Sequence, residues 1–293
     1  MTDPVFGRLR ELLGAEGVER SADGSPVATP DSPDAIAHLC QVSNEEGWRV
    51  RIEGRGTWLD ADAPCDLAIR LRALDRVTAV SPEDLVTTIQ AGAPLDAVGL
   101  HLAERGMRLA LDPPGRPDRS LGSVVATATA GPARLGYGAV RDHILGCTVV
   151  TGDGRLVRSG GRVVKNVAGY DLTRLQVGGF GAFGILTEVH CRLRALPRAD
   201  ETLFVRGNRN VLLALARDTL EAGITPVALE LFSPALAAGP DWVLAARFQG
   251  GGSAVHAEVQ RLPQGEGAVW EAVAPERSSA FWALAARAAL GAG

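Results

Sequence analysis

The order of apolar and polar residues near the start of the chain predicts two helices with a linker between them. Residues 1–20 repeat apolar side chains at helical spacing and predict an amphipathic helix. Residues 21–34 are rich in proline, serine and aspartate, so they predict a linker or turn. Residues 31–47 predict a second helix, because Asp31 or Ser32 can cap its first turn and a proline follows.

Alternating apolar and polar residues predict strands further along. Such alternation runs over 48–54, 65–74 and, most strictly, 185–196. Residues 81–106 pass from a strand pattern into a helix pattern, so this part of the chain predicts a βαβ-like first unit. Residues 147–159 predict a hairpin, because two apolar runs meet at a Gly-Asp-Gly turn.

Small residues dominate the middle of the chain. Residues 109–146 contain prolines, glycines, alanines and threonines with almost no bulk for a core, and they predict loops. A short helix is predicted over 168–178, directly before the strand at 185–196.

After Pro197 the pattern changes to β-α-β-β-α, which predicts a small unit of the split-βαβ type. Residues 275–290 predict a last helix whose apolar face needs a cover, and we expect this face to contact a partner. The chain is therefore expected to be an α+β protein. Its expected parts are an N-terminal helix and linker over 1–26, a main domain over 27–198 and a short α+β domain over 199–293.

Composition narrows the class of protein. The chain has 293 residues, of which 46% are hydrophobic and 22% charged, as in ordinary globular proteins. Its net charge of −4 and its 5% aromatic content argue against a nucleic-acid-binding surface. No apolar run is long enough for a membrane span, and the N-terminus lacks the features of a secretory signal. We expect a cytoplasmic protein, with attachment to the inner face of a membrane through partners as an alternative.

Cysteines and histidines predict neither a metal site nor a disulfide framework. The 4 cysteines lie far apart without a C-x-x-C, and the 5 histidines form no H-x-H or H-x-x-x-H pair. No cysteine spacing here would hold an iron–sulfur cluster. The only lysine, Lys165, is a compact point charge that arginine does not reproduce, although a structural role is favoured for it.

One glycine pattern is similar to a dinucleotide-binding turn but stands in the wrong context. Gly179, Gly181 and Gly184 spell G-x-G-x-x-G, which cradles a pyrophosphate when a strand precedes it and a helix follows. Here a predicted helix precedes the glycines and a predicted strand follows them. No ribose-binding acid ends a second strand about twenty residues further on. The pattern therefore favours a turn that allows close backbone approach over a nicotinamide site.

The stretch 113–138 has the same small-residue character. Its exposed amides, beside the glycine-rich turn, could line a deep slot for a flat ligand that carries phosphate. A tight cluster of loops without a ligand is the alternative that either stretch alone supports.

Together these stretches resemble one known family. The likeness rests on residues from Gly131 to Pro197, above all KNVAGYDL at 165–172 and VGGFGAFGILTEV at 177–189. They are similar to the FAD-binding domain of the vanillyl-alcohol oxidase and para-cresol methylhydroxylase (PCMH) type. Within it they resemble the smaller FAD-binding component of bacterial glycolate oxidases. The likeness extends from about Val27 and implies a two-subdomain PCMH-type fold, followed by the short second domain, with FAD extended between two α+β subdomains.

The resemblance also implies where FAD binds. A glycine-rich turn after an early strand would donate its amides and a hydroxyl to the pyrophosphate. A second wall would face the pyrophosphate and the flavin ring, and a late strand would close over the ribityl or adenine end. The implied cofactor-binding residues are Gly54, Arg55, Gly56, Thr57, Pro114, Gly115, Gly122, Ser123, Val124, Ala126, Gly131, Gly138, Ile185 and Thr187.

The chain departs from the family pattern within these walls. Arg55 stands where relatives usually have glycine, no further glycine follows soon after Thr57, and Ser123 replaces the second of two glycines. Some relatives tether FAD through a histidine in the first turn. No histidine lies between His38 and His101, so we expect non-covalent FAD.

The resemblance implies a redox function within a complex. In the family a 2-hydroxy acid gives a hydride to flavin, which accepts two electrons and releases them singly. Dehydrogenase subunits of the family usually add a histidine-rich metal site, whereas the second domain here has only His256. We therefore expect an FAD-binding subunit of a glycolate-oxidase-like complex, beside a catalytic flavoprotein subunit and an iron–sulfur subunit.

Two other interpretations stay open. A degenerate member that serves as an assembly scaffold, with weak or no flavin binding, fits the departures from the family pattern. A stand-alone 2-hydroxy-acid dehydrogenase is less compatible with the missing histidines. No catalytic residue is assigned. The polar residues to test, each with a structural role favoured over direct chemistry, are Arg134, Tyr137, Arg141, Lys165 and Tyr170.

Overall fold

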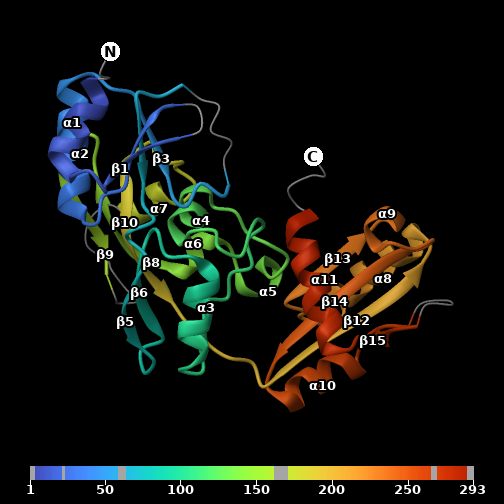
Figure 1. The fold of residues 1–293 in the computed structure, drawn as a ribbon. Coiled ribbons are helices and arrows are strands. Elements are labelled where there is room, and N and C mark those ends of the chain that lie inside the picture. Colours follow the sequence, from blue (N-terminus) through green and yellow to red (C-terminus); the bar gives the residue numbers. More distant parts are fainter. Residues whose placement is uncertain (1–3, 22–23, 59–63, 162–170, 265–268, 289–293) are drawn as a thin grey trace. The chain divides into compact units, whose positions relative to one another are not determined.

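The structure, a computed structural model, describes residues 4–21, 24–58, 64–161, 171–264 and 269–288 (Figure 1). Contacts within the chain divide it into two compact α+β units. The first unit comprises residues 1–109, 115–129 and 140–195. The second unit comprises residues 110–114, 130–139 and 196–293, so two short segments from the middle of the chain join it.

A four-stranded sheet in the first unit comes from the start of the chain. Its strands lie in the order β1 (Val18–Arg20), β2 (Pro26–Ala28), β4 (Leu67–Arg70) and β3 (Val50–Glu53). Strands β2 and β3 both run parallel to β4, while β1 pairs antiparallel with β2. Helix α1 (Pro4–Leu13) packs on β1 and β2. Helix α2 (Pro33–Glu45) starts at the N-cap Ser32, one of the two caps that the sequence predicts.

A five-stranded antiparallel sheet forms the rest of the core of the first unit. Its strands lie in the order β5 (Val77–Ser81), β6 (Val86–Gln90), β10 (Ile185–Arg192), β8 (Ile144–Val150) and β9 (Leu156–Gly160). The central strand β10 follows the predicted alternation, and β8 with β9 is the predicted hairpin. The helices of this unit also include α3 (Leu95–Ala103), α4 (Leu121–Thr127), α6 (Val140–His143) and α7 (Leu172–Gln176). A short ladder joins β7 (Met107–Arg108) and β11 (Arg194–Ala195).

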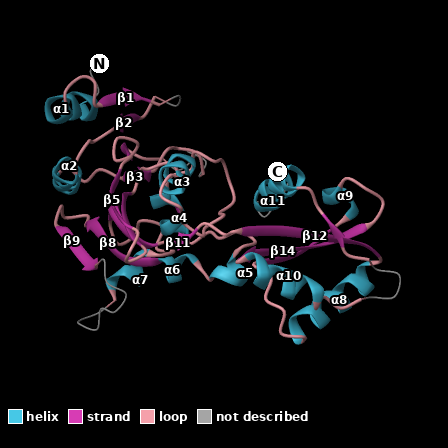
Figure 2. Cartoon of the chain, turned by 90° about the horizontal axis from the view of Figure 1, so that it is seen from below, coloured by secondary structure: helices cyan, strands magenta, loops and turns pink. Residues whose placement is uncertain are grey.

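The second unit is built on one antiparallel sheet with helices on both faces (Figure 2). The strands lie in the order β13 (Ala228–Phe232), β14 (Trp242–Gly250), β12 (Ala199–Gly207) and β15 (Glu271–Ala272). Because β14 is antiparallel to both β12 and β13, those two strands are parallel to each other, which confirms the predicted split-βαβ unit. Helices α8 (Arg209–Glu221) and α10 (Gly252–Gln260) cover one face, and α9 (Pro234–Ala237) and α11 (Pro275–Ala288) cover the other. Helix α5 (Arg134–Tyr137) also belongs to this unit.

Several predicted elements near the N-terminus need correction. The helix predicted over 1–20 ends at Leu13, because Gly14 takes φ +77° and the chain then forms β1. The predicted linker contains strand β2, which pairs on both sides. The βαβ connection therefore runs β2–α2–β3, earlier in the chain than predicted.

The prediction of loops throughout 109–146 is wrong for α5, α6 and the start of β8, and above all for α4. Ser120 caps this helix, and its small residues allow it to pack on β6 and β10. The expectation that the apolar face of the last helix contacts a partner is also wrong. Trp282 and Ala285 of α11 pack on Phe204 and Ala245 of the chain's own sheet.

Candidate cofactor-binding site

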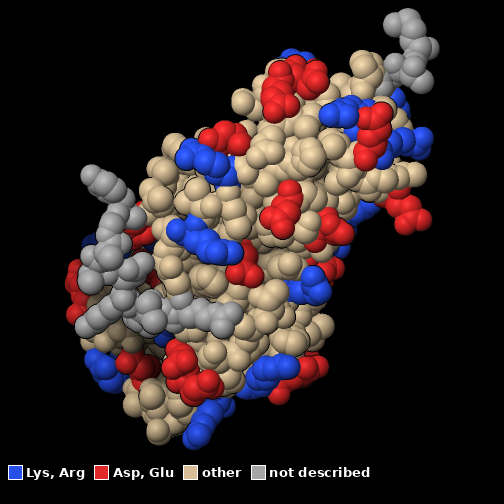
Figure 3. Space-filling view, turned by 90° about the vertical axis from the view of Figure 1, so that its left-hand side faces the viewer, with Lys and Arg blue, Asp and Glu red and all other residues tan. Residues whose placement is uncertain are grey.

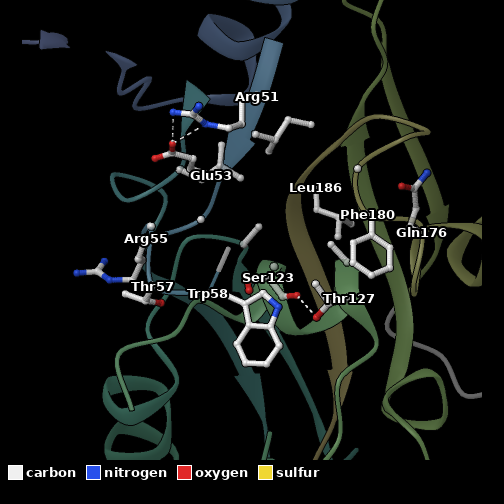
Figure 4. Close-up of a pocket in the computed structure, with 18 of the residues that line it drawn as sticks. Arg51, Glu53, Arg55, Thr57, Trp58, Ser123, Thr127, Gln176, Phe180 and Leu186 are labelled. Carbon is white, nitrogen blue, oxygen red and sulfur yellow. Dashed lines mark hydrogen bonds and ion pairs between the residues drawn. The ribbon is translucent and has the colours of Figure 1, made fainter. Parts of the chain in front are cut away.

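A cavity of about 290 Å³ lies in the first unit, where the turn 54–57 meets α4 (Figure 4). The turn follows β3 directly. A Cβ on Gly54 would collide with Oγ of Ser120, so only glycine allows this close approach. Gly56 has φ +68°, a backbone conformation that glycine adopts readily. The two glycines therefore bring the backbone of the turn to the edge of the cavity.

The helix α4 forms a second side of the cavity. A Cβ on Gly122 would lie 2.7 Å from the carbonyl oxygen of Ala91, so a glycine is needed for the helix to pack here. The backbone N–H of Gly122 also donates to this oxygen, at 2.7 Å. Ser123, Ala126 and Thr127 then face the cavity from the next turns of the helix.

The glycine-rich turn 178–184 forms a third side. It follows α7 and precedes β10, so the order is helix, turn, strand, opposite to that of a nicotinamide-binding turn. The N–H of Gly178 donates to the oxygen of Val125 at 3.0 Å, and the N–H of Phe180 to that of Ala126 at 2.9 Å. Phe180 takes φ +51°, which is rare for a bulky residue, and its ring lies at the edge of the cavity with 67% of its surface exposed.

Ion pairs surround the β3 side of the cavity. Glu53 accepts hydrogen bonds from Nε of Arg51 at 3.0 Å and from Nε and Nη2 of Arg70 at 3.0 and 2.9 Å. Arg70 also pairs with Glu19. Two guanidinium groups thus neutralise the Glu53 carboxylate, and Arg55 adds a further positive charge to the lining. The charged side chains that line the cavity are therefore two arginines, Arg51 and Arg55, and one carboxylate, Glu53.

The remaining charges show no comparable grouping on the face drawn in Figure 3. There, acidic and basic side chains of the described residues are interspersed without a large area of one sign.

Some of the predicted cofactor residues lie together around this cavity. Those that line it are Gly54, Arg55, Gly56, Thr57, Gly122, Ser123 and Ala126. Ile185 lines an adjoining cavity of about 220 Å³, which shares Ile52, Gly181 and Gly184 with the first. Gly115 packs against the indole of Trp58, since a Cβ there would lie 3.1 Å from Cε3.

Other predicted residues lie outside the lining. Val124 is fully buried in α4, and Thr187 donates its hydroxyl to the carbonyl oxygen of Thr148 at 3.2 Å within the sheet. Pro114, Gly131 and Gly138 belong to the second unit. A role in cofactor binding stays a prediction for each of them.

The polar residues singled out in the sequence that the structure describes, Arg134, Tyr137 and Arg141, do not line the cavity. Tyr137 donates its hydroxyl to Oε1 of Gln249 at 3.0 Å, within the second unit. Arg134 and Arg141 are exposed. Lys165 and Tyr170 lie outside the described residues.

Sequence reasoning missed several residues that line the cavity. They are Arg51, Ile52, Glu53, Trp58, Leu71, Ala91, Thr127, Gln176, Phe180 and Leu186, whereas Gly181 and Gly184 belong to the glycine-rich turn that the sequence had indicated. Two of the missed residues could have been found from the sequence. Trp58 directly follows the turn 54–57, and Phe180 interrupts a run of glycines. Arg51, Ile52, Glu53 and Thr127 are neighbours in sequence of predicted site residues. The remaining residues come close to the turn 54–57 only in the folded chain.

Comparisons with known proteins agree with this geometry. Residues 25–160 match the FAD_binding_4 family, described as an FAD binding domain. The chain is 43% identical over 123 residues to the glycolate oxidase subunit GlcE of Escherichia coli K12. These 123 residues are 42% of this chain and 35% of that protein. The chain is 30% identical over 233 residues to the glycolate oxidase subunit GlcD of Bacillus subtilis 168, or 78% of this chain and 49% of that one. The matches thus span about a third to a half of these relatives.

The fold is shared with a solved structure of alkyldihydroxyacetonephosphate synthase, with a TM-score of 0.80 over 97% of this chain and 63% of that one. The sequence identity is 15%, so this likeness concerns the fold alone.

Fold and cavity together define an α+β flavoprotein with a PCMH-type FAD-binding domain. Residues 25–160 belong to this family of FAD-binding domains, and the cofactor is FAD. The cavity fits such a ligand, since close-packed glycines expose backbone next to arginine side chains.

Two further features of the structure concern membranes and metals. Within the described ranges, no helix has the length and apolar character needed to cross a membrane. In the same ranges, no three His, Cys, Asp or Glu side chains are grouped so that they could hold a metal ion.

Proposed function

We propose that this chain is the FAD-binding redox subunit of a glycolate-oxidase-like complex and holds FAD non-covalently. The observation that carries the proposal is the cavity where the turn 54–57 and α4 meet, within a match to an FAD-binding family. Backbone amides of such a turn are suited to phosphate oxygens. The adjoining cavity at Ile185 offers more room to an extended dinucleotide.

The chain's own residues would bind and orient the cofactor. The amides of the turn and the hydroxyl of Thr57 would donate to the pyrophosphate, while Ser123 and Thr127 present hydroxyls from α4. Arg55 would offset phosphate charge. Bound FAD would supply two-electron acceptance and one-electron release.

Substrate oxidation is assigned to a companion subunit. A 2-hydroxy acid would lose a hydride and a proton there and become a 2-oxo acid, and an iron–sulfur subunit would carry the electrons onward. The support is that relatives are named as separate glycolate oxidase subunits. The family's histidine-rich metal site also has no counterpart in the second domain, where His256 is the only histidine.

A second candidate function is an assembly subunit that binds little or no flavin. One observation favours it: the Glu53 carboxylate lines the cavity beside the turn, where it would repel a phosphate. The pairing of Glu53 with Arg51 and Arg70 opposes this interpretation, because the two guanidinium groups offset the charge of the carboxylate.

The visible absorption spectrum of the purified chain separates the two functions. We expect bands near about 370 and 450 nm, typical of the flavin ring, and release of FAD on heating. A protein that stays colourless after incubation with FAD, alone and with its partner subunits, would contradict the redox assignment.

Two glycine variants test whether the flavin occupies this cavity. Gly54→Ala is expected to lower the flavin content, since its Cβ would meet Ser120. Gly7→Ala is the control, because Gly7 lies in α1 and an added methyl group would meet nothing within 4 Å. Equal flavin content in both variants would place the cofactor elsewhere.

A further inference from the structure

Arg119 is a cation buried directly behind the wall of the cavity. Among the described residues it is the largest side chain that is fully buried, with 0% of its surface exposed. Its guanidinium lies 3.4 Å from the ring centroid of Trp58. Its Nε donates to Oγ of Ser123 at 3.0 Å, and its Nη2 to Oγ1 of Thr127 at 2.7 Å and to the Ser123 carbonyl oxygen at 3.3 Å. Burying a guanidinium is costly, and these contacts offset part of that cost.

All three of these partners line the cavity, and they come from two different sides of it. Trp58 directly follows the turn 54–57, whereas Ser123 and Thr127 lie one turn apart on α4 (Figure 4). Arg119 therefore connects the turn 54–57 to the helix α4, which faces this turn. The N-cap Ser120, next in the chain, touches the same turn at Gly54.

The partners of Arg119 also include positions at which the chain departs from the family pattern. The family resemblance implies a glycine where Ser123 stands, and Trp58 starts the run after Thr57 that lacks a further glycine. The hydroxyl of Ser123 and the ring of Trp58 are what Arg119 contacts. The three residues are thus a linked set in which each departure has a structural partner.

We propose that Arg119 is a positioning residue for FAD, which holds Trp58, Ser123 and Thr127 as one wall and favours the pyrophosphate by its charge. This inference rests on the proposed function. Burial lowers the pKa of Arg119 to about 10, so the side chain still carries its charge at neutral pH. A charge in a buried setting acts on a ligand more strongly than one in water.

The test compares ligands with and without phosphate. Arg119→Met keeps an unbranched apolar side chain, shorter than that of arginine, and removes the charge and the donors. We expect the Kd for FAD and for ADP to rise at least about tenfold, as loss of charge-assisted hydrogen bonds predicts. The Kd for riboflavin, which has no phosphate, should rise less. Arg119→Lys should recover part of the loss for ADP, because it restores the charge without the planar fork.

A matched control lies three residues away. Arg116 is exposed and pairs with Asp118 at 2.9 Å. Arg116→Met should change the Kd for FAD by less than about twofold, as is usual for surface ion pairs. Trp58→Leu should weaken FAD binding in the wild-type background but add little to Arg119→Met, since coupled residues are not additive.

The outcomes separate this inference from the function on which it rests. Wild-type protein that binds no FAD overturns the proposed function. Two results overturn the inference alone when the wild-type protein binds FAD. In the first, Arg119→Met weakens the binding of FAD, ADP and riboflavin equally. In the second, it weakens the binding of none of them. If Arg119→Met does not fold, Ser123→Gly and Trp58→Leu take its place. Unchanged FAD and ADP binding in both would then overturn the inference.

Discussion

Individual thiols in the first unit differ in their exposure, and this predicts their reactivity. Burial raises the pKa of Cys40 and Cys147 to about 11 and that of Cys191 to about 12. The thiolate is the reactive form, so these three are expected to be inert at pH 8. Cys65 is only half-buried. We expect iodoacetamide to modify Cys65 alone in the folded protein and all 4 cysteines in urea, as read by mass spectrometry. Rapid labelling of Cys191 in the folded protein would contradict the burial.

A half-buried carboxyl in the second unit, that of Asp112, predicts a dependence of stability on pH. Burial raises the pKa of Asp112, although the N–H of Ala133 donates to its Oδ2 at 2.9 Å. Burial and the neighbouring Asp112 charge also raise the pKa of Glu230. The folded state therefore holds protons that the unfolded state releases above the ordinary Asp pKa of about 4. The contribution of each group to stability is present at low pH and is lost as the pH rises through the folded pKa.

The variant Asp112→Asn tests this sign. It keeps an oxygen that can accept the Ala133 hydrogen bond and removes the titrating group. The free energy of unfolding should fall less steeply with rising pH than in the wild type, as followed by tryptophan fluorescence in urea. A steeper fall in the variant would show that the sign is wrong.

Two helices of the first unit predict opposite effects of the same substitution. In α4, Gly122→Ala would place a Cβ 2.8 Å from that of Ala91, so overpacking should destabilise the protein by about 1–3 kcal/mol. In α3, Gly99 is exposed with nothing within 4 Å, so Gly99→Ala should stabilise by about 0.5–1 kcal/mol. Urea unfolding without added flavin measures both. Similar effects of the two variants would mean that α4 does not approach β6 this closely.

An element could be predicted when neighbouring residues in the sequence determine it, and not when packing against distant elements does. Strict alternation predicts β10, and a capping serine with a following proline predicts α2, because both signals are local. The helix α4 has small residues in place of an apolar stripe, and it is stabilised by packing on β6 and β10 that the sequence does not display. Strand β2 was missed because its proline and short length are typical of a linker.

The site shows the same contrast between residues that are neighbours in sequence, which could be predicted, and residues that only folding brings together, which could not. The turn 54–57 is continuous in sequence, so a family motif is enough to predict it. Phe180 and Thr127 reach the cavity only because the turn 178–184 docks on α4, a contact between segments about fifty residues apart. The burial of Arg119 could not be predicted either, since an arginine in a Pro-rich loop is usually exposed.

Cofactor binding should change hydrogen exchange unevenly over the whole molecule. The cavity is lined by residues of the first unit alone, so bound FAD should slow exchange most over 52–57 and 121–127. Peptides from α8 and α10 in the second unit serve as internal controls and should change little, because each unit has its own core. Peptides over 130–138 test a separate prediction, since slower exchange there would support cofactor contacts of Gly131 and Gly138. If 52–57 and 121–127 exchange equally fast with and without FAD, the cofactor does not occupy this cavity and binds elsewhere on the chain.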